Sequence, residues 1–277
     1  MTRRGDQSSP QRLKVGGQAL PDGIMMRTER AWAVARADGS VVSGDLAPPL
    51  WPKVPVLRVL AGLAQGLWLG LAGPARRRQG GQRRSHRMLW ALLGAEMAAL
   101  ALGWLAGRTH PPQWAHPVVE VGLWLGAIAA FRLLAPRVQW RYHGAEHKAV
   151  TAYEQGLDLA DVDAVLGCPR VHARCGTNLI VWLALCAPVI SRLPGLAQVA
   201  ALPVALAVIA ELLAIGARSP DSAAAKVLLA PGAAMQSFVT TREPSASEQA
   251  VGCMALTACL ARHDQVVGKE LIGAGRQ

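Results

Sequence analysis

Two histidines and a glutamate near the middle of the chain have the types and the spacing of a metal site. Residues 142–148 read Tyr-His-Gly-Ala-Glu-His-Lys. In a helix, His143 and His147 lie one turn apart on the same face, so both imidazoles can reach one ion. Glu146 projects beside them, where a carboxylate can act as a general base. The run predicts a divalent metal ion, most simply zinc, with Glu146 as the catalytic residue.

Three further residues are candidates to complete the metal site. The order His-x-x-Glu-His is that of the inverted zincins, although two histidines can also be ordinary polar residues of a structural helix. His172 and Cys175 follow Cys168 in the spacing C-x-x-x-H-x-x-C, and cytosolic thiols stay reduced and available to a metal. Glu211 is a rival ligand, because a carboxylate in an apolar segment needs an ion or an arginine partner. Three protein ligands plus water indicate a catalytic ion, and four indicate a structural one.

The metal motif requires a helix on the polar side of a membrane. Residues 142–155 are predicted to form that helix, which Gly156 ends. Glu154 falls on the same helical stripe as the two histidines, about 10 Å beyond His147, so it is expected to support the site rather than bind the same ion.

The composition is that of a membrane protein. Of the 277 residues, 52% are hydrophobic and 17% are charged, the mean hydropathy is +0.24, and nine tryptophans suit membrane–water interfaces. The small number of cysteines and the absence of Gly-X-Y or heptad periods exclude disulfide scaffolds, collagen and coiled coils. The net charge of +11 does not predict nucleic-acid binding, because the arginines cluster at 76–87 between apolar stretches. There they predict a cytosolic loop that attracts anionic headgroups.

We therefore expect a mainly α, polytopic helical membrane protein with about four spans, one interfacial or re-entrant helix, and a small N-terminal β-hairpin element on the cytosolic side. Asp38-Gly39 between two apolar runs predicts the hairpin. The arginine distribution predicts that both termini are cytosolic. The expected parts are a disordered tail (1–12), the β element (13–50), a helix (54–73), a first transmembrane hairpin (88–135), a cytosolic segment with the metal motif (136–177), a second transmembrane hairpin (178–217) and a cytosolic helical segment (218–277).

The helix at 54–73 has two interpretations. Its apolar residues gather on one half of the helix, which favours a position in the plane of the membrane interface. Gly62, Gly66 and Gly70, however, form a four-residue repeat that permits close helix packing within a membrane. A spanning helix would place the N-terminus outside, and we favour the interfacial interpretation.

Taken together, the motifs resemble the YqhQ-like family, bacterial membrane proteins of unknown function that are described as predicted metal-dependent enzymes. The likeness rests on residues 142–148, 153–154 and 172–177, and on the shorter runs 16–19, 23–27, 231–232, 236 and 240–244. Two departures are Ala173, where the family usually has proline, and Asp22, where it usually has the longer glutamate. The resemblance implies a metal and a place in the bacterial cytoplasmic membrane. Residues expected to support the ion or bind substrate are Asp22, Arg27, Glu154, Arg174, Gln236 and Arg242.

Three functions fit these expectations. The first is a metal-dependent hydrolase with its site at the cytosolic membrane interface. The second is a non-enzymatic scaffold with a structural metal, and the third is a transporter that uses Glu96, Glu120 and Glu211. An open coordination position favours the first, four protein ligands favour the second, and a polar path past Glu96 or Glu120 favours the third. Neither a substrate nor a protein partner is indicated by these motifs.

Overall fold

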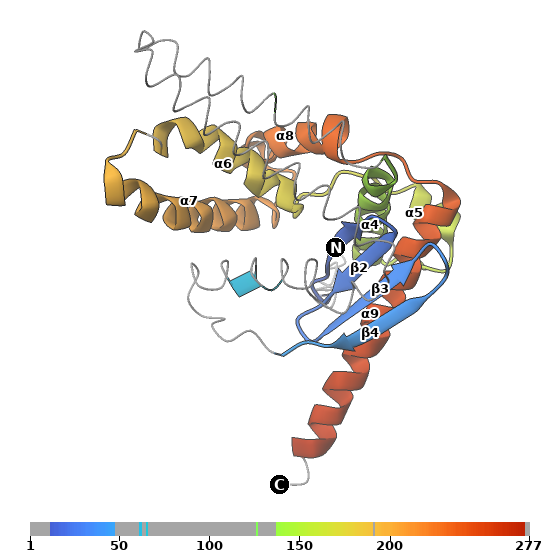
Figure 1. Cartoon of the computed structure of the whole chain (residues 1–277). Coiled ribbons are helices and arrows are strands. Elements are labelled where there is room, and N and C mark those ends of the chain that lie inside the picture. Colours follow the sequence, from blue (N-terminus) through green and yellow to red (C-terminus); the bar gives the residue numbers. More distant parts are fainter. Residues whose placement is uncertain are drawn as a thin grey trace, which may run out of the picture.

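The computed structural model describes residues 12–47, 137–190 and 192–274, with residues 61, 62, 65 and 126 as isolated positions. The described chain is mainly helical with an N-terminal antiparallel sheet (Figure 1). The arginine run at 76–87 lies outside the described residues, as do nearly all of the predicted helix at 54–73 and of the first predicted transmembrane hairpin at 88–135.

Four short strands form an antiparallel sheet in the order of the sequence: β1 (Gly16–Leu20), β2 (Gly23–Arg27), β3 (Ala31–Arg36) and β4 (Val41–Asp45). The predicted hairpin connects β3 and β4, with Gly39 at its turn in the left-handed region (φ 81°) that glycine adopts without a steric penalty. A second hairpin, not predicted, connects β1 to β2 and gives the register Gly17 opposite Met26.

Two helices cover one face of this sheet. They are α4 (Arg137–Gln155) and α9 (Ala246–Ala274), which pack against each other and against the strands (Figure 1). Strand alternation points Ile24, Met26 and Ala33 towards the helices, where they join a buried core with Ala145 and Leu256. Met25, Trp32 and Val34 point the other way into a second buried cluster. The sheet therefore provides a rigid support directly beneath the metal motif on α4.

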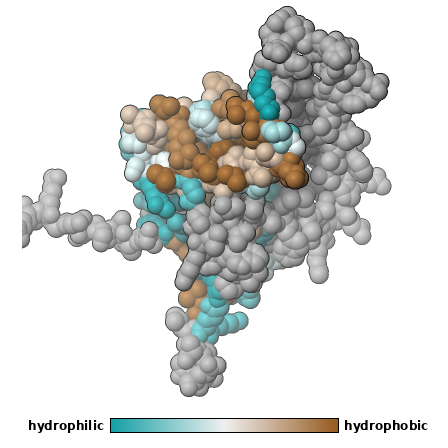
Figure 2. Space-filling view, turned by 90° about the vertical axis from the view of Figure 1, so that its left-hand side faces the viewer, coloured by the Kyte–Doolittle hydropathy of each residue, from teal (hydrophilic) through white to brown (hydrophobic). Residues whose placement is uncertain are grey.

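The remaining described helices carry the apolar part of the chain. They are α6 (Gly176–Ile190), α7 (Gly195–Gly216) and α8 (Ala223–Met235), followed by the π-helical turn η2 (Gln236–Thr240), while the short α5 (Val162–Leu166) follows α4. Within the described residues, α7 is the one helix long and apolar enough to cross a membrane, where two spans were predicted for the hairpin at 178–217. Apolar side chains gather over α6 and α7 on the surface of Figure 2, with Leu196 and Val199 among the most exposed.

The ends of the site-bearing helices follow local sequence signals. Helix α4 ends at Gln155, and Gly156 adopts a positive φ of 82°, as its position after the helix requires. At the start of α9, the Glu248 carboxylate accepts a hydrogen bond from the Ser245 N–H (2.8 Å), and the Ser245 hydroxyl accepts one from the Glu248 N–H (3.3 Å). This reciprocal capping box fixes where α9 begins, immediately after the segment that packs on α4.

Candidate metal centre

The two motif histidines on α4 are held in matching orientations by backbone carbonyls. The Nδ1 atom of His143 lies 2.7 Å from the Thr240 carbonyl oxygen, and that of His147 lies 2.7 Å from the Arg170 carbonyl oxygen. Because a carbonyl only accepts, each Nδ1 carries the proton and donates it. Each Nε2 is therefore left with its lone pair, which is the form in which imidazole binds a metal.

Cys175 completes a group of three metal-binding side chains. Its Sγ lies 3.4 Å from Nε2 of His143, and one donor atom from each of His143, His147 and Cys175 lies within 4.8 Å of the others. The Thr177 N–H donates to this sulfur (3.4 Å) at the beginning of α6. Burial lowers the pKa of His147, which keeps the imidazole neutral as a ligand must be. Two imidazoles and a thiol in this arrangement can hold a metal ion.

Glu146 lies beside the three donors but outside their group. It is buried between α4 and β1, and a Cβ atom on Gly17 would lie 2.7 Å from its Oε1. Burial raises the pKa of Glu146, while the charges of His143 and His172 act in the opposite direction. A glycine on β1 thus gives this carboxylate room to pack against the sheet and still line the cavity next to the histidines.

His172 is beside the group rather than within it. Its Nε2 pairs with Oε2 of Glu154 at 3.2 Å, and its Nδ1 accepts a hydrogen bond from the Arg174 N–H at 3.3 Å. Both ring nitrogens are therefore engaged, although the ring centroid lies 5.9 Å from that of His147. Glu154 was expected on the same stripe of α4 as the two motif histidines. At this position its carboxylate is next to the loop that carries His172, and it pairs with the His172 imidazole.

Glu154 and Arg174 fasten the loop that carries Cys175. The Glu154 carboxylate pairs with the Arg174 guanidinium as well as with His172. Burial pushes the pKa of Glu154 upwards, but the hydrogen bonds and charges of His172 and Arg174 outweigh burial, so its pKa is lowered. These contacts hold the loop against α4, and through the loop they position the thiol.

Gln236 holds the other side of the same loop. Its side chain is fully buried, its Oε1 accepts a hydrogen bond from the His172 N–H (2.8 Å), and its Nε2 donates to Asn178 (3.4 Å). Asn178 in turn donates to the Ala173 carbonyl (2.7 Å), and Gly232 leaves no space for a Cβ beside it. Gln236, expected to support the ion or bind substrate, is thus a positioning residue for residues 172–175.

The other four predicted site residues occupy different places. Asp22 pairs with Arg36 and is not among the described residues that line the cavity. Arg27 lines the cavity, and the Arg242 backbone N–H donates to the Trp140 carbonyl on α4 (2.9 Å). Glu211 lies in α7, outside the group of three donors, and it is not among the described residues that line the cavity.

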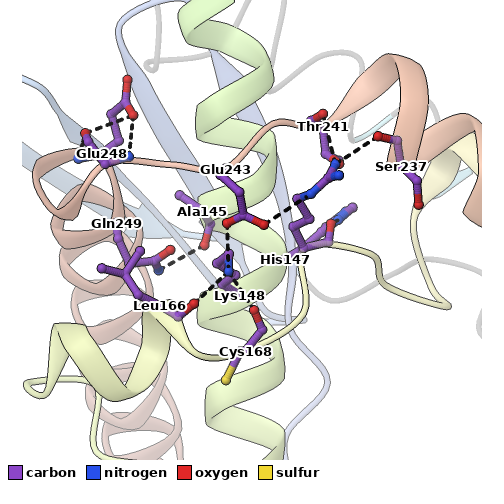
Figure 3. Close-up of polar contacts among 12 residues, drawn as sticks. Ala145, His147, Lys148, Leu166, Cys168, Ser237, Thr241, Glu243, Glu248 and Gln249 are labelled. Carbon is purple, nitrogen blue, oxygen red and sulfur yellow. Dashed lines mark hydrogen bonds and ion pairs between the residues drawn. The ribbon is translucent and has the colours of Figure 1, made fainter.

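An ionic network around the buried Lys148 ammonium, not predicted from the sequence, supports the backbone segment that orients His147 (Figure 3). The Lys148 ammonium donates to the carbonyls of Leu166 and Cys168 (both 2.7 Å) and pairs with Glu243 at 3.0 Å. Glu243 also pairs with Nε of Arg170 (3.2 Å), whose carbonyl orients His147. Lys148 directly follows the motif, but spacing alone gives no sign of its contacts with residues 18 to 95 positions away.

Cys168, grouped with His172 and Cys175 by spacing, packs instead in an apolar cluster.

A cavity of about 620 Å³ opens over the three donors. Its described lining includes the metal-binding group and Glu146 together with residues of β1, β2, α6, α8 and η2. The site is therefore assembled from elements on both sides of the undescribed region between residues 66 and 125, and the cavity has room for a molecule of moderate size.

Comparison with known proteins gives a family but no activity. A family model described as a protein of unknown function (DUF1385) matches residues 102–262, more than half of the chain. The uncharacterized protein YqhQ of Bacillus subtilis (strain 168) is 33% identical over 113 residues, which are 38% of this chain and 35% of that relative. The chain thus matches about a third of the length of this relative, and the resemblance to a YqhQ-like family is confirmed. No solved structure matches the chain.

Proposed function

Because the chain belongs to the DUF1385 family, whose function is unknown, we propose a function from its site: a membrane-bound, metal-dependent hydrolase with its centre at the cytosolic membrane interface. The observation that carries the proposal is the group of three donors, His143, His147 and Cys175, whose donor atoms lie within 4.8 Å of one another in a cavity that also exposes Glu146. Three protein ligands with space beside them are typical of a catalytic rather than a structural zinc ion.

The donor set favours zinc among the divalent ions. Imidazole nitrogen and thiolate sulfur are both preferred zinc ligands, whereas magnesium and calcium prefer oxygen. When bound, such an ion supplies Lewis acidity and lowers the pKa of water, so that water becomes a nucleophile near neutral pH.

The chain's own residues supply the remaining requirements of hydrolysis. The Thr240 and Arg170 carbonyls fix the tautomers of His143 and His147. The Glu146 carboxylate, held by its packing against Gly17, can accept a proton from water at a carboxylate oxygen and return it to the leaving group. The cavity walls shield that proton transfer from part of the bulk water.

The membrane location is proposed from the apolar helices. Helix α7 has the length and hydropathy of a span, and α6 and α7 expose apolar side chains over their surface (Figure 2). A soluble chain rarely exposes so large an apolar area. With the arginines at 76–87 on the cytosolic side and near anionic headgroups, residues 136–177 and both termini are cytosolic, in a bacterial cytoplasmic membrane.

Metal analysis of the purified full-length protein tests the proposal. We expect about one zinc ion per chain in the wild type and almost none in His147→Ala, because loss of one ligand of three removes most of the affinity. His172→Gln is the matched control, since it removes a nearby imidazole that lies outside the donor group but keeps an amide that can donate to Glu154 and hold the loop. Metal content unaffected by His147→Ala would overturn the site. Loss of metal in His172→Gln as well would support a closed, four-ligand structural site and hence the scaffold alternative.

A further inference from the structure

The cavity over the candidate metal centre has two chemically different walls. One wall carries the donor group and Glu146. The other is formed by the apolar side chains of Ile180 and Val181 on α6, Met235 on α8 and Val239 on η2. A molecule that fills this cavity would therefore place a polar group at the site and an apolar part along the second wall.

The apolar wall continues into the exposed apolar surface. Ile180 lines the cavity and is also 63% exposed, and Phe238, which precedes Val239, is 81% exposed. Ile180 belongs to α6, whose apolar side chains Figure 2 shows at the surface together with those of α7, and Phe238 lies in η2, the turn that follows α8. If that surface lies in the bilayer, a molecule with a hydrocarbon chain can enter the cavity without leaving the lipid phase.

Arg27 gives the polar side of the cavity a positive charge that forms no ion pair with a carboxylate of the described residues. It projects from β2 into the lining, and its partner among the described residues is the neutral amide oxygen of Gln65, at 3.3 Å. The second arginine of the lining, Arg174, is paired with Glu154. Burial lowers the pKa of Arg27, which reflects the cost of enclosing a cation. An anionic group in the cavity would compensate that cost.

We propose that the cavity binds an anionic amphiphile, with its anionic head against Arg27 and its hydrocarbon chain against Ile180, Val181, Met235 and Val239. This inference rests on the proposed function, for which it names the substrate class. In the hydrolysis that it implies, water is added across an ester or phosphoester bond of the head. The water oxygen bonds to the carbonyl carbon or phosphorus, the bond to the departing oxygen breaks, and that oxygen takes the proton.

Binding of simple probes tests the ligand class. Calorimetric titration of the full-length protein in a neutral detergent should show that decyl phosphate binds and that inorganic phosphate binds much more weakly, since the free anion gains nothing from the apolar wall. Arg27→Gln should weaken decyl phosphate binding by about tenfold, the effect of losing one charge-assisted contact. Arg218→Gln is the matched control, because it removes an exposed arginine beyond the end of α7 and should leave the affinity unchanged.

Two results would overturn the proposal. Equal affinity for inorganic phosphate and decyl phosphate would show that the cavity takes a free anion and that the apolar wall contributes nothing. Equal effects of Arg27→Gln and Arg218→Gln would show that Arg27 does not receive the anionic head. If Arg27→Gln does not fold, the affinities of the wild type for inorganic, butyl and decyl phosphate still test the proposal. The affinity must rise with the length of the hydrocarbon chain, and an affinity that does not rise contradicts the proposal.

The metal measurement distinguishes failure of this proposal from failure of the proposed function. If decyl phosphate binds in an Arg27-dependent way to a protein without a stoichiometric metal, the proposal of an amphiphile ligand is supported and the proposal of a metal-dependent hydrolase is contradicted. Loss of metal in His147→Ala, together with binding that depends neither on Arg27 nor on the length of the hydrocarbon chain, would support the metal centre and contradict the proposal of an amphiphile ligand.

Discussion

Glu146 combines two properties that structural carboxylates rarely share: it is buried against the sheet, and it lines the cavity beside two imidazoles. Lys148, the next buried charge on α4, has an ionic partner in Glu243, whereas Glu146 forms no ion pair with another described residue. A carboxylate kept in this environment is suited to proton transfer rather than to holding elements together.

The substitution Glu146→Gln separates proton transfer from structure. It keeps the shape and hydrogen-bonding capacity of the side chain but removes its basicity. We expect it to retain the metal and the fold while lowering the rate by about 10² to 10⁴, the usual cost of losing a general base. Complementation of a deletion strain, with metal content measured in parallel, gives the readout. Full complementation by a metal-loaded variant would reject the catalytic role.

At the level of elements, the site depends on how closely β1 approaches α4. Gly17 lies against the Glu146 side chain, whereas a Cβ on the neighbouring Gly16 would come no nearer than 3.9 Å to another described atom, Nε of Arg27. The two glycines occupy the same strand, so they share backbone effects and differ in what surrounds their Cα atoms.

Gly17→Ala should therefore displace Glu146 and destabilise the protein by about 1–3 kcal/mol, the usual cost of overpacking. Gly16→Ala is the control and should change the unfolding temperature little, because its Cβ meets ordinary van der Waals contact. Thermal unfolding of both variants in detergent measures the difference. An equal, small effect of the two substitutions would show that the strand does not constrain the carboxylate.

Local signals in the sequence predicted the parts of the site that lie within one element. The spacing of His143 and His147, the end of α4 at Gly156 and the hairpin at Asp38-Gly39 all follow from short-range geometry, and the structure has these features. Cys175 was proposed from residue type and lies near both histidines in the structure. The contacts that decide the first three features span few residues, whereas Cys175 lies 32 positions from His143.

Long-range pairing explains what the sequence could not reveal. His172 had the right residue type and spacing for a ligand, but Glu154 and the Arg174 N–H occupy both of its ring nitrogens. The contact between Lys148 and Glu243 joins residues that are far apart in the chain, and the fit of Glu146 beside Gly17 depends on the packing of a sheet on a helix. Periodicity carries no information about such pairs.

At the scale of the whole molecule, the proposal requires the polar parts to share one side of the membrane. The α6–α7 pair extends away from the sheet (Figure 1), so its connecting loop should reach the opposite side. Single cysteines introduced at Ala160, Leu193 and Gln265, all exposed, can be tested with a membrane-impermeant maleimide in intact cells. We expect labelling at position 193, and labelling at 160 and 265 only after permeabilisation. Opposite accessibility of positions 160 and 265 would contradict the topology.

An open metal centre with three protein ligands differs from a closed one in the atoms around the ion, and X-ray absorption spectroscopy of the zinc-loaded protein measures these atoms. We expect one sulfur at about 2.3 Å, two imidazole nitrogens at about 2.0–2.1 Å and a remaining light ligand that is not imidazole. The sulfur contribution should disappear in Cys175→Ser. A spectrum with three imidazoles and one sulfur, or one without sulfur in the wild type, would contradict an open centre of His143, His147 and Cys175.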